Sequence, residues 1–549
     1  MNILKLIKIN FHRIIHLDRS CQLKMLKRKN YIHGGDDGII PSHVHLGTFM
    51  LFRAKNYDTK IAMIDADTDK RMTYTEFAQL SVNIALSLKK LGVGIGDVVC
   101  VCSEKRMEFM PTIVGVCCTG ASFAAGDNSV KNDAFLYRLN ILKPKVLFIS
   151  QTSYEIHKHT LSTMNIEHIV IYGKGPEKTF EEFLSESADV EEFEATPVKG
   201  WEDIAVIQFS SGTTGLPKAA KFTHLNFILA ITQSKRKYQS FDVNNKYAGS
   251  MSLVTREWYY TYGLYHTLSS LALGACVVFT RDNIMEDYLR AIEKYQIKNL
   301  QIVPNSLIDI KNCLNGEKYD LSSVEYIHST SLPISKHLIT GVKIIFPNIK
   351  DLKQSYGMTE LGCVIHKEIP KGDKLGTVGT ACVGTVIKVV DMKTNEALGP
   401  NCRGEIRFKS LSLMAGYVGE SNRDYLDEEG FYKTGDVGYY DDDKYFYIVD
   451  RIKQLLKYKG ATISPAEVEM ALVKHPGLKD VGVTSHPFSE APVVFVVTQH
   501  GCDVTLQEMN DILHVEMPTA SLSEIRFVAA IPRGVGTKID RNALKNMLK

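Results

Sequence analysis

A loop of hydroxyl side chains and glycines carries the strongest chemical signal in the sequence. It follows an apolar run at residues 204–209 and precedes a helical pattern that begins near Thr223 and His224. Glycines let backbone N–H groups turn toward an anion, hydroxyls add donors and a lysine adds positive charge, so the loop predicts a site for phosphate oxygens. Ala219 after the lysine and a different glycine spacing exclude a Walker loop. The residues concerned are Ser210, Ser211, Gly212, Thr213, Thr214, Gly215 and Lys218.

Two further segments place oxygen ligands beside aromatic rings. Tyr356, Thr359 and Glu360 follow a predicted strand, so a ring, a hydroxyl and a carboxylate come together there. Asp436 ends the run Tyr-Lys-Thr-Gly-Asp, in which the glycine indicates a tight turn. Taken singly, each has a plain alternative: Asp436 as a turn residue at a strand end, and the glycine-containing loop as polar surface.

A basic stretch begins at residue 449, after an acidic turn at 441–443, and continues through Ser464 to Glu469. Its charged and glycine positions are Asp450, Arg451, Lys453, Lys457 and Gly460. Farther along, Lys538 closes the run Gly-Val-Gly-Thr-Lys. A lone lysine near a C-terminus is usually solvated, so its interpretation depends on the other motifs.

In this order, the four motifs resemble those of the superfamily of acyl-CoA synthetases, nonribosomal adenylation domains and beetle luciferases. The nearest likeness is to the insect luciferase and 4-coumarate–CoA ligase branch, over about residues 47–545. The resemblance implies an acid–thiol ligase that uses ATP, Mg²⁺ and CoA to convert a hydrophobic carboxylic acid into an acyl-adenylate and then a thioester. Two alternatives stay open: luciferase-like adenylation followed by oxygenation, and a diverged paralogue that binds nucleotide or acyl ligand without turnover.

The resemblance also implies roles on the nucleotide side. The loop at 210–215 with Lys218 would hold the β- and γ-phosphates, and Tyr356 would stack on adenine. Thr359 would contact the α-phosphate, while Glu360 would bind Mg²⁺, a hard cation that prefers oxygen ligands.

Two more roles concern the ribose and the charge that develops during reaction. Asp436, with Arg451 beside it, would accept hydrogen bonds from the ribose hydroxyls. Lys538 matches the catalytic lysine of the family and would neutralise negative charge on the α-phosphate as the carboxylate attacks in line.

In this family the small domain rotates between the two half-reactions, which exchanges one of its faces for another over the same site. Asp450 matches the pivot, and Lys453 is close to it in sequence. Lys538 would serve adenylation, whereas Lys457 and Gly460 would lie on the face presented to CoA.

The acyl pocket is where the sequence departs from the family pattern. Tyr260 occupies a position that usually holds histidine, and Tyr262 is two residues later. Thr330, Ser331 and Ser355 stand where the family has glycines, which let a ligand approach the backbone closely. These side chains predict a narrow, apolar pocket for medium-chain fatty or small aryl acids. The other aromatics of the stretch are expected to divide between pocket and core, namely Trp258, Tyr259 and Tyr265.

Apolar runs alternate with helical patterns from about residue 47 to residue 436. Val98–Cys102 and Val146–Ser150 are typical runs, and residues 74–91 and 109–119 are typical helical patterns. The alternation predicts βαβ units, hence an α/β fold with parallel sheets covered by helices. We expect a basic amphipathic extension at 1–30, a large ATP- and acyl-binding adenylation domain at 31–449, and a small mobile α+β domain at 450–549 that acts as a catalytic lid.

The composition favours small-molecule partners. The 65 basic and 62 acidic residues give a formal net charge of +3, which offers no reason to expect nucleic acid. The eleven cysteines are scattered without a Cys-x-x-Cys pair and favour a reducing compartment. No apolar run reaches the ~18 residues expected of a membrane span. The oligomeric state stays open.

Signals for localisation disagree. The first 30 residues mix apolar and basic side chains, so a mitochondrial address, a membrane-surface helix and a dispensable extension before Met25 are the alternatives. The family resemblance suggests a peroxisomal enzyme, yet the chain ends in Met-Leu-Lys rather than the Ser-Lys-Leu signal. The cytosol is the remaining expectation, or mitochondria if the extension is an address.

Overall fold

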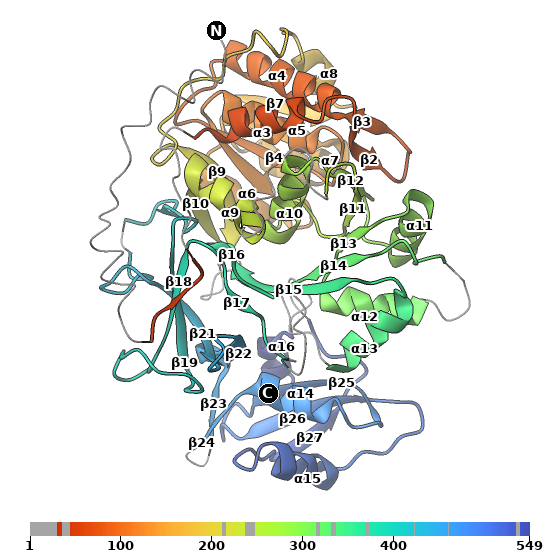
Figure 1. Ribbon diagram of the computed structural model, residues 1–549, viewed down its shortest axis with the longest axis vertical. Helices are drawn as coiled ribbons and strands as arrows, with labels where there is room; N and C mark the ends of the chain where they lie inside the picture. Colours follow the sequence, from red (N-terminus) through yellow and green to blue (C-terminus); the bar gives the residue numbers. More distant parts are fainter. Residues whose placement is uncertain are drawn as a thin grey trace.

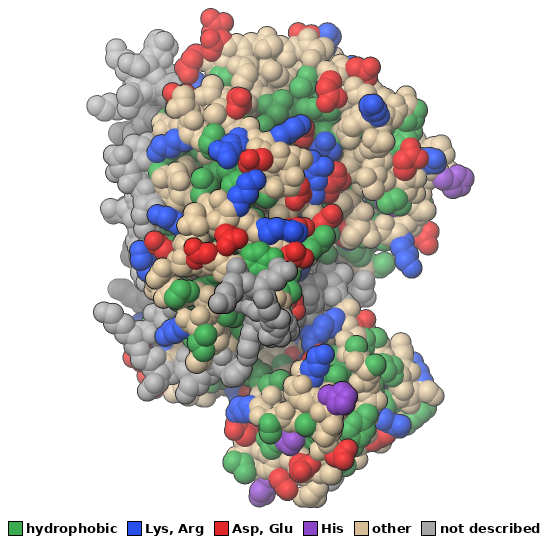
Figure 2. Space-filling view, turned by 90° about the vertical axis from the view of Figure 1, so that its right-hand side faces the viewer, with side chains coloured by type: hydrophobic (Ala, Val, Ile, Leu, Met, Phe, Trp, Pro, Cys, Tyr) green, Lys and Arg blue, Asp and Glu red, His purple; other side chains and the backbone are tan. Residues whose placement is uncertain are grey.

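The structure is a computed structural model, and Figure 1 shows three sheets with their helices in a large upper part and two small sheets in a lower part. Positive and negative side chains are interspersed over the face shown in Figure 2, in keeping with the small net charge. The residues described are 30–35, 44–210, 216–236, 247–313, 319–330, 336–367, 374, 376–421, 423–458, 461–533 and 539–549. The predicted extension therefore lies almost wholly outside them.

An eight-stranded sheet is built mainly from the first half of the chain. Its strands run parallel from β9 to β8, whereas β10 and β20 are antiparallel additions at one edge. The central strands are continuous apolar runs, as expected of strands buried on both faces. In spatial order they are β20 (Gly416–Tyr417), β10 (Lys218–Thr223), β9 (Ile204–Ser210), β5 (Ser122–Gly126), β4 (Val98–Cys102), β6 (Val146–Ser150), β7 (His168–Tyr172) and β8 (Lys178–Thr179).

A nine-stranded sheet lies beside the first. It is parallel from β15 to β2 and has antiparallel strands at both ends. In order its strands are β17 (Thr380–Ala381), β16 (Gly362–Lys367), β15 (Asp351–Met358), β14 (Tyr326–Ser329), β13 (Asn299–Gln301), β11 (Met251–Val254), β12 (Cys276–Phe279), β2 (Ile61–Asp65) and β3 (Arg71–Thr73).

Helices cover these two sheets, and the wholly buried α5 lies among them against α3 and α4. The helices of the large part are α3 (Leu46–Lys55), α4 (Tyr74–Lys90), α5 (Phe109–Cys118), α6 (Asn132–Leu142), α7 (Gln151–Leu161), α8 (Phe180–Phe183), α9 (His224–Arg236), α10 (Thr261–Ala272), α11 (Met285–Tyr295), α12 (Pro304–Cys313) and α13 (Lys336–Ile345).

A five-stranded antiparallel sheet completes the large part. Its first strand, β1, pairs Ile32 with Ile387, so the beginning of the described chain is tied to its second half. The strands are β1 (Ile32–His33), β18 (Thr385–Val390), β19 (Gly404–Ser410), β21 (Tyr432–Tyr440) and β22 (Phe446–Arg451).

The lower part has its own core, in which Val468, Leu472, Val483 and Leu513 are buried together. A short 3-10 turn, η1 (Ile452–Gln454), leads into it. Its elements are the hairpin β23 (Leu456–Tyr458) and β24 (Ala461–Ile463), the sheet β25 (Leu478–Ser485), β26 (Pro492–Thr498) and β27 (Glu524–Phe527), and the helices α14 (Pro465–Leu472), α15 (Leu506–Glu516) and α16 (Arg541–Asn546).

The predicted fold class is confirmed: a large part of helix-covered, mainly parallel sheets precedes a small α+β part. The predicted strands and helices named above are all present within a few residues. Among the described residues, none of the helices is both long enough and apolar enough to cross a membrane.

Candidate active site

The candidate active site lies where the three large sheets meet, because side chains from all three contact one another there. Several predicted site residues fall outside the described part of the chain: Ser211, Gly212, Thr213, Thr214, Gly215, Ser331, Gly460 and Lys538. The remaining ones can be placed.

The predicted phosphate loop connects two antiparallel strands. Ser210 ends β9, Lys218 begins β10, and the two residues are paired across the ladder. The sequence interpretation of a strand, a loop and then a helix was therefore incomplete, since the six residues of β10 precede the helix that starts at His224. The Lys218 ammonium is 2.8 Å from a carboxylate oxygen of Glu420 and lies 5.0 Å from the Tyr417 ring centroid.

Tyr417 also links this lysine to the predicted metal ligand. The Tyr417 hydroxyl donates a hydrogen bond of 2.9 Å to Glu360 Oε1, and Tyr432 lies 3.3 Å from the same hydroxyl. Glu360 is 7% exposed, and its backbone carbonyl accepts from the Met414 N–H. Burial, together with the Glu360 charge, raises the pKa of the Tyr417 phenol, so this hydroxyl stays a donor.

The predicted adenine and ribose residues are in direct contact although they are distant in sequence. The Tyr356 hydroxyl donates to Asp436 Oδ2, and Arg451 Nε lies 3.1 Å from Asp436 Oδ1. Asp436 lies within β21 opposite Arg451 of β22, so the predicted position on a tight turn is wrong. Burial raises the pKa of Tyr356 well above its usual value, and the Asp436 charge acts in the same direction.

Thr359 connects the nucleotide side to helix α10. The Thr261 hydroxyl, in the first residue of that helix, donates to Thr359 Oγ1 at 3.0 Å. The helix start therefore contacts the residue that the sequence assigned to the α-phosphate, and a helix N-terminus favours negative charge.

The predicted acyl-pocket residues lie next to this point. Thr330 donates to the Ser355 carbonyl at 2.7 Å, and Tyr262 donates to the His328 carbonyl at 2.8 Å. His328 Nε2 and the Ser355 hydroxyl share a further hydrogen bond. The Tyr260 ring contacts Tyr259, with centroids 4.5 Å apart.

Other aromatics of the same stretch pack in the core, as the alternative interpretation allowed. The Trp258 ring contacts Phe109 and Phe279, with centroids 5.4 and 4.9 Å apart. Tyr265 contacts Phe227 at 4.9 Å. Trp258 and Tyr265 therefore belong to the hydrophobic core rather than to the predicted pocket.

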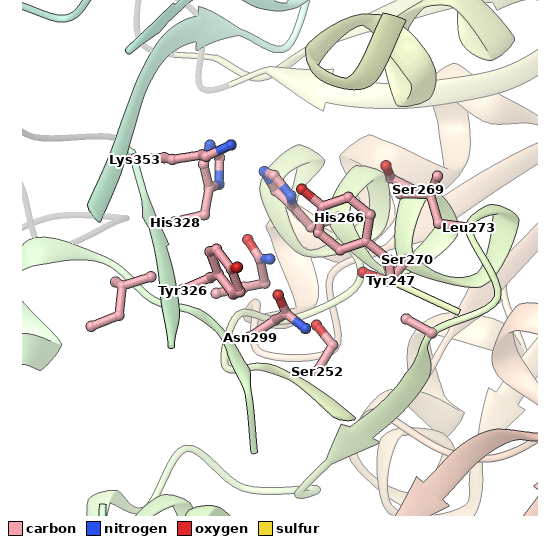
Figure 3. Close-up of a pocket in the computed structure, with 13 residues that line it drawn as sticks. Tyr247, Ser252, His266, Ser269, Ser270, Leu273, Asn299, Tyr326, His328 and Lys353 are labelled. Atoms are coloured by element: carbon pink, nitrogen blue, oxygen red, sulfur yellow. The ribbon is translucent and has the colours of Figure 1, made fainter. Parts of the chain in front are cut away.

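Sequence reasoning missed a polar pocket beside these residues. A cavity of about 40 Å³ lies between α10 and strands β11, β13, β14 and β15 (Figure 3). Most of its lining residues carry a polar group, although more of the lining surface is apolar than polar, so the cavity is mixed in character where the sequence suggested an apolar acyl pocket. The helical period could have revealed His266, which is one turn after Tyr262 on the same face. Its polar side chains include Ser252, His266, Asn299, Gln301, His328 and Lys353.

The predicted hinge residues join the two parts of the chain. Asp450 Oδ2 accepts hydrogen bonds from the Ser464 hydroxyl at 2.8 Å and the Ala466 N–H at 3.1 Å, so this carboxylate holds the start of α14. Lys453 is exposed on η1. Lys457 is exposed on β23 and faces Thr462 across the hairpin.

Known proteins match nearly the whole chain. The sequence profile of the AMP-binding enzyme family matches residues 52–418, and that of the AMP-binding enzyme C-terminal domain matches residues 467–537. The chain is 31% identical over 509 residues to the luciferin 4-monooxygenase of Nipponoluciola cruciata, a match that covers 89% of this chain and 91% of that protein.

Two other similar proteins extend this result. The chain is 30% identical over 523 residues to 4-coumarate–CoA ligase 1 of Petroselinum crispum, which covers 93% of this chain and 95% of the ligase. The solved structure of the luciferase-like enzyme from the nonluminescent mealworm Zophobas morio matches with a TM-score of 0.71 at 29% identity, covering 77% of this chain and 99% of that one. The branch predicted from the motifs is confirmed.

Proposed function

Because the chain belongs to the AMP-binding enzyme family, we propose that it activates a carboxylic acid with ATP and Mg²⁺ to an acyl-adenylate and then forms the CoA thioester. Enzymes of this family use ATP, and 4-coumarate–CoA ligase is among the relatives. The proposal adds that this chain activates a carboxylic acid, that it needs Mg²⁺ and that it transfers the acyl group to CoA.

The observation that carries the proposal is the contact between motifs that are far apart in sequence. Tyr356 and Asp436 are hydrogen-bonded, and Arg451 completes this corner. Glu360 accepts a hydrogen bond from the Tyr417 hydroxyl, and the Lys218 ammonium lies over the ring of the same tyrosine. The residues that the motifs assign to adenine, ribose, the metal ion and the phosphates therefore lie around one site, which supports the proposal.

In the first step, an oxygen of the substrate carboxylate attacks the α-phosphorus, and the bond from that phosphorus to the oxygen bridging it to the β-phosphate breaks. Pyrophosphate leaves with the electron pair of that bond. Lys218 would exchange its contact with Glu420 for the leaving phosphates. Thr359 and the start of α10 would face the α-phosphate, and Lys538 would neutralise the charge that develops there.

The site fits a magnesium ion that arrives with the nucleotide. No cluster of three or more potential metal ligands occurs within the described ranges. Glu360 offers a buried carboxylate beside the Tyr417 hydroxyl, which suits an ion that is held by one or two carboxylates, phosphate oxygens and water. Bound there, the ion would neutralise phosphate charge and orient the leaving group.

In the second step, the CoA thiolate attacks the acyl carbon, AMP leaves as the bond to its phosphate oxygen breaks, and the thiol proton passes to solvent. Rotation about Asp450 would bring Lys457 and Gly460 to the site in place of Lys538. The bonds from Asp450 to Ser464 and Ala466 support this role, because they fasten the moving part at a single residue.

Adenylation followed by oxygenation is the second candidate. The observation that favours it is the 31% identity to a luciferin 4-monooxygenase. Light emission with supplied luciferin, ATP and oxygen would support it over thioester formation.

ATP–pyrophosphate exchange against a panel of carboxylic acids, with and without Mg²⁺, tests the proposal, and mass spectrometry after adding CoA identifies the product. We expect metal-dependent exchange with at least one acid and its CoA thioester as product. Exchange without thioester for every acid would leave adenylation and refute the ligase step. Nucleotide binding without exchange would identify a non-catalytic paralogue.

A further inference from the structure

The cavity lies against the second half of α10, away from the N-terminal end of that helix. Thr261 contacts Thr359 at the reaction centre, and His266 is five residues farther along α10. At 1.5 Å per residue, His266 is about 7.5 Å from Thr261 along the helix axis. A carboxylic acid activated at Thr359 would therefore extend its other end toward His266.

The imidazole rings of His266 and His328 and the ammonium group of Lys353 line this cavity. The His266 and His328 rings have centroids 4.3 Å apart, and the Lys353 side chain extends beside His328 from β15 (Figure 3). Lys353 Nζ lies 3.4 Å from Asp351, whose carboxylate is not part of the lining. Among the described residues that line the cavity there is no aspartate or glutamate. An imidazole or ammonium donor binds a carboxylate more strongly than a neutral acceptor, because the hydrogen bond is charge-assisted.

Two further lining atoms are buried without a protein partner. Ser252 is 1% exposed and Gln301 is 9% exposed. Neither the Ser252 hydroxyl nor Gln301 Oε1 forms a hydrogen bond within the described residues. Leaving such an atom unsatisfied costs roughly 1–3 kcal/mol, and a hydrocarbon chain would satisfy neither. The Ser252 hydroxyl can donate to a carboxylate, whereas Gln301 Oε1 is an acceptor and needs a donor such as water.

We propose that the substrate is a dicarboxylic acid, whose second carboxylate is bound by His266, His328 and Lys353 while the first is activated. The inference rests on the proposed function and reverses the preference for apolar acids that the sequence suggested. His328 Nε2 is hydrogen-bonded to the Ser355 hydroxyl, which fixes the orientation of this ring.

Acids of equal length that differ in one terminal group test the proposal. Suberate and octanoate each have eight carbons, and 8-hydroxyoctanoate adds a neutral polar group at the same place. We expect kcat/KM for pyrophosphate exchange to be at least tenfold higher for suberate than for either other acid. Equal or better turnover of octanoate, or a preference for the hydroxy acid, would overturn the dicarboxylate assignment.

Variants separate recognition from folding. Lys353→Met and His266→Phe should each lower kcat/KM for suberate at least tenfold while octanoate changes less than threefold. Lys353→Arg should keep the preference, and Lys350→Met, which removes an exposed lysine paired with Glu325, should change nothing. Equal losses for both acids in the two pocket variants would refute the proposed contact.

A binding measurement distinguishes the two failures. If the wild type exchanges pyrophosphate with no acid, the proposed function fails, and calorimetric titration of the full-length protein with suberate and octanoate decides about the cavity. Tighter binding of suberate that Lys353→Met removes would still support the inference. Equal binding of the two acids would end it.

Discussion

The nucleotide end and the acyl end of the candidate site differ in how their side chains are held and in how well sequence motifs describe them. At the nucleotide end, Tyr356, Asp436 and Arg451, which the motifs assign to adenine and ribose, contact one another. At the acyl end, Thr330 donates to the Ser355 carbonyl, and the Ser355 hydroxyl shares a hydrogen bond with His328, at positions where the resemblance led us to expect glycine.

The difference has a chemical reason. Every member of such a family must bind the same adenine, ribose and phosphates, which fixes residue types and spacing. The acid varies, so the acyl end can change without loss of the common step. Substitutions at the nucleotide end should therefore affect all acids equally, whereas substitutions at the acyl end should change the order of preference among acids.

The largest expected effect belongs to Lys538. We expect Lys538→Ala to lower pyrophosphate exchange ~10²–10³-fold, the order expected for one preorganised charge at the reacting phosphate. The loss should be the same for every acid, with ATP binding retained. Lys474→Ala is the control, because Lys474 forms an exposed pair with Glu516 that contributes little. A loss of exchange that depended strongly on the acid would show that Lys538 does not act at the nucleotide end alone.

Lys457 should act on the second half-reaction only. If the small domain rotates, Lys457→Ala should leave exchange within about twofold of wild type and reduce thioester formation from preformed acyl-adenylate by ~10²-fold. Lys479→Ala, an exposed lysine on β25, is the matched control. Equal effects of Lys457→Ala on both steps would mean that one pose of the small domain serves both.

Asp436→Asn should weaken ATP binding without changing the preference among acids. The variant keeps the shape of the side chain but removes the charge that faces Arg451 and the ribose. A hydrogen bond to a charged group contributes roughly 1.5–3 kcal/mol, so the KM for ATP should rise ~10–10²-fold. Asp442→Asn, at an exposed carboxylate bonded to Asn401, should leave that KM unchanged.

A smaller effect, confined to the acyl end, is expected for Ser355→Gly. Removing this buried hydroxyl opens space and releases His328 from its hydrogen bond. Acids with a substituent of one or two carbons should gain about tenfold in kcat/KM, the usual range for such a change in a pocket. The KM for ATP should stay as it is. A change in that KM similar to the change for the acid would show that the two ends are not separable.

The same division explains what the sequence could predict. Continuous apolar runs such as Val146–Ser150 predicted the parallel strands, because only a strand buried on both faces needs such a run. The strand β10 was missed since its sequence, Lys-Ala-Ala-Lys-Phe-Thr, has little period and directly precedes a helix. The antiparallel sheet was missed because its pairing joins residues as distant as Ile32 and Ile387.

The site divides in the same way. Tyr356, Glu360 and Asp436 could be predicted as site residues because each belongs to a short motif. His266, His328 and Lys353 were not, because they lie on three elements whose proximity depends on the order of strands in the sheet and on how α10 packs against it. Apart from the helical spacing of Tyr262 and His266, spacing along the chain contains no signal for that arrangement.

The smallest effect on catalysis is expected for a pair of histidines between α3 and α9, the buried His224 and the half-buried His45, which couple stability to pH. His224 starts α9, and its Nδ1 accepts a hydrogen bond of 3.0 Å from the Leu46 N–H. The His45 ring lies beside it, with centroids 4.7 Å apart. Burial lowers the pKa of His224 to about 3 and that of His45 to about 4, in each case from 6.5.

These two pKa shifts fix the sign of the pH dependence. Above pH 6.5 both rings are neutral in the folded and unfolded chain, so their contribution to stability is complete. As the pH falls below 6.5, both histidines bind protons in the unfolded chain but not in the folded protein. The free energy of unfolding therefore falls by about 1.4 kcal/mol per pH unit for each histidine. His224→Asn, whose amide oxygen can accept from Leu46, should remove one of these protons and flatten the decline in Tm between about pH 6.5 and pH 4.5. His500→Asn, at an exposed position of the small part, should leave the decline unchanged. Pyrophosphate exchange near neutral pH should be unaffected in both variants. Identical pH profiles of Tm for His224→Asn and the wild type would show that this histidine pair does not control acid stability.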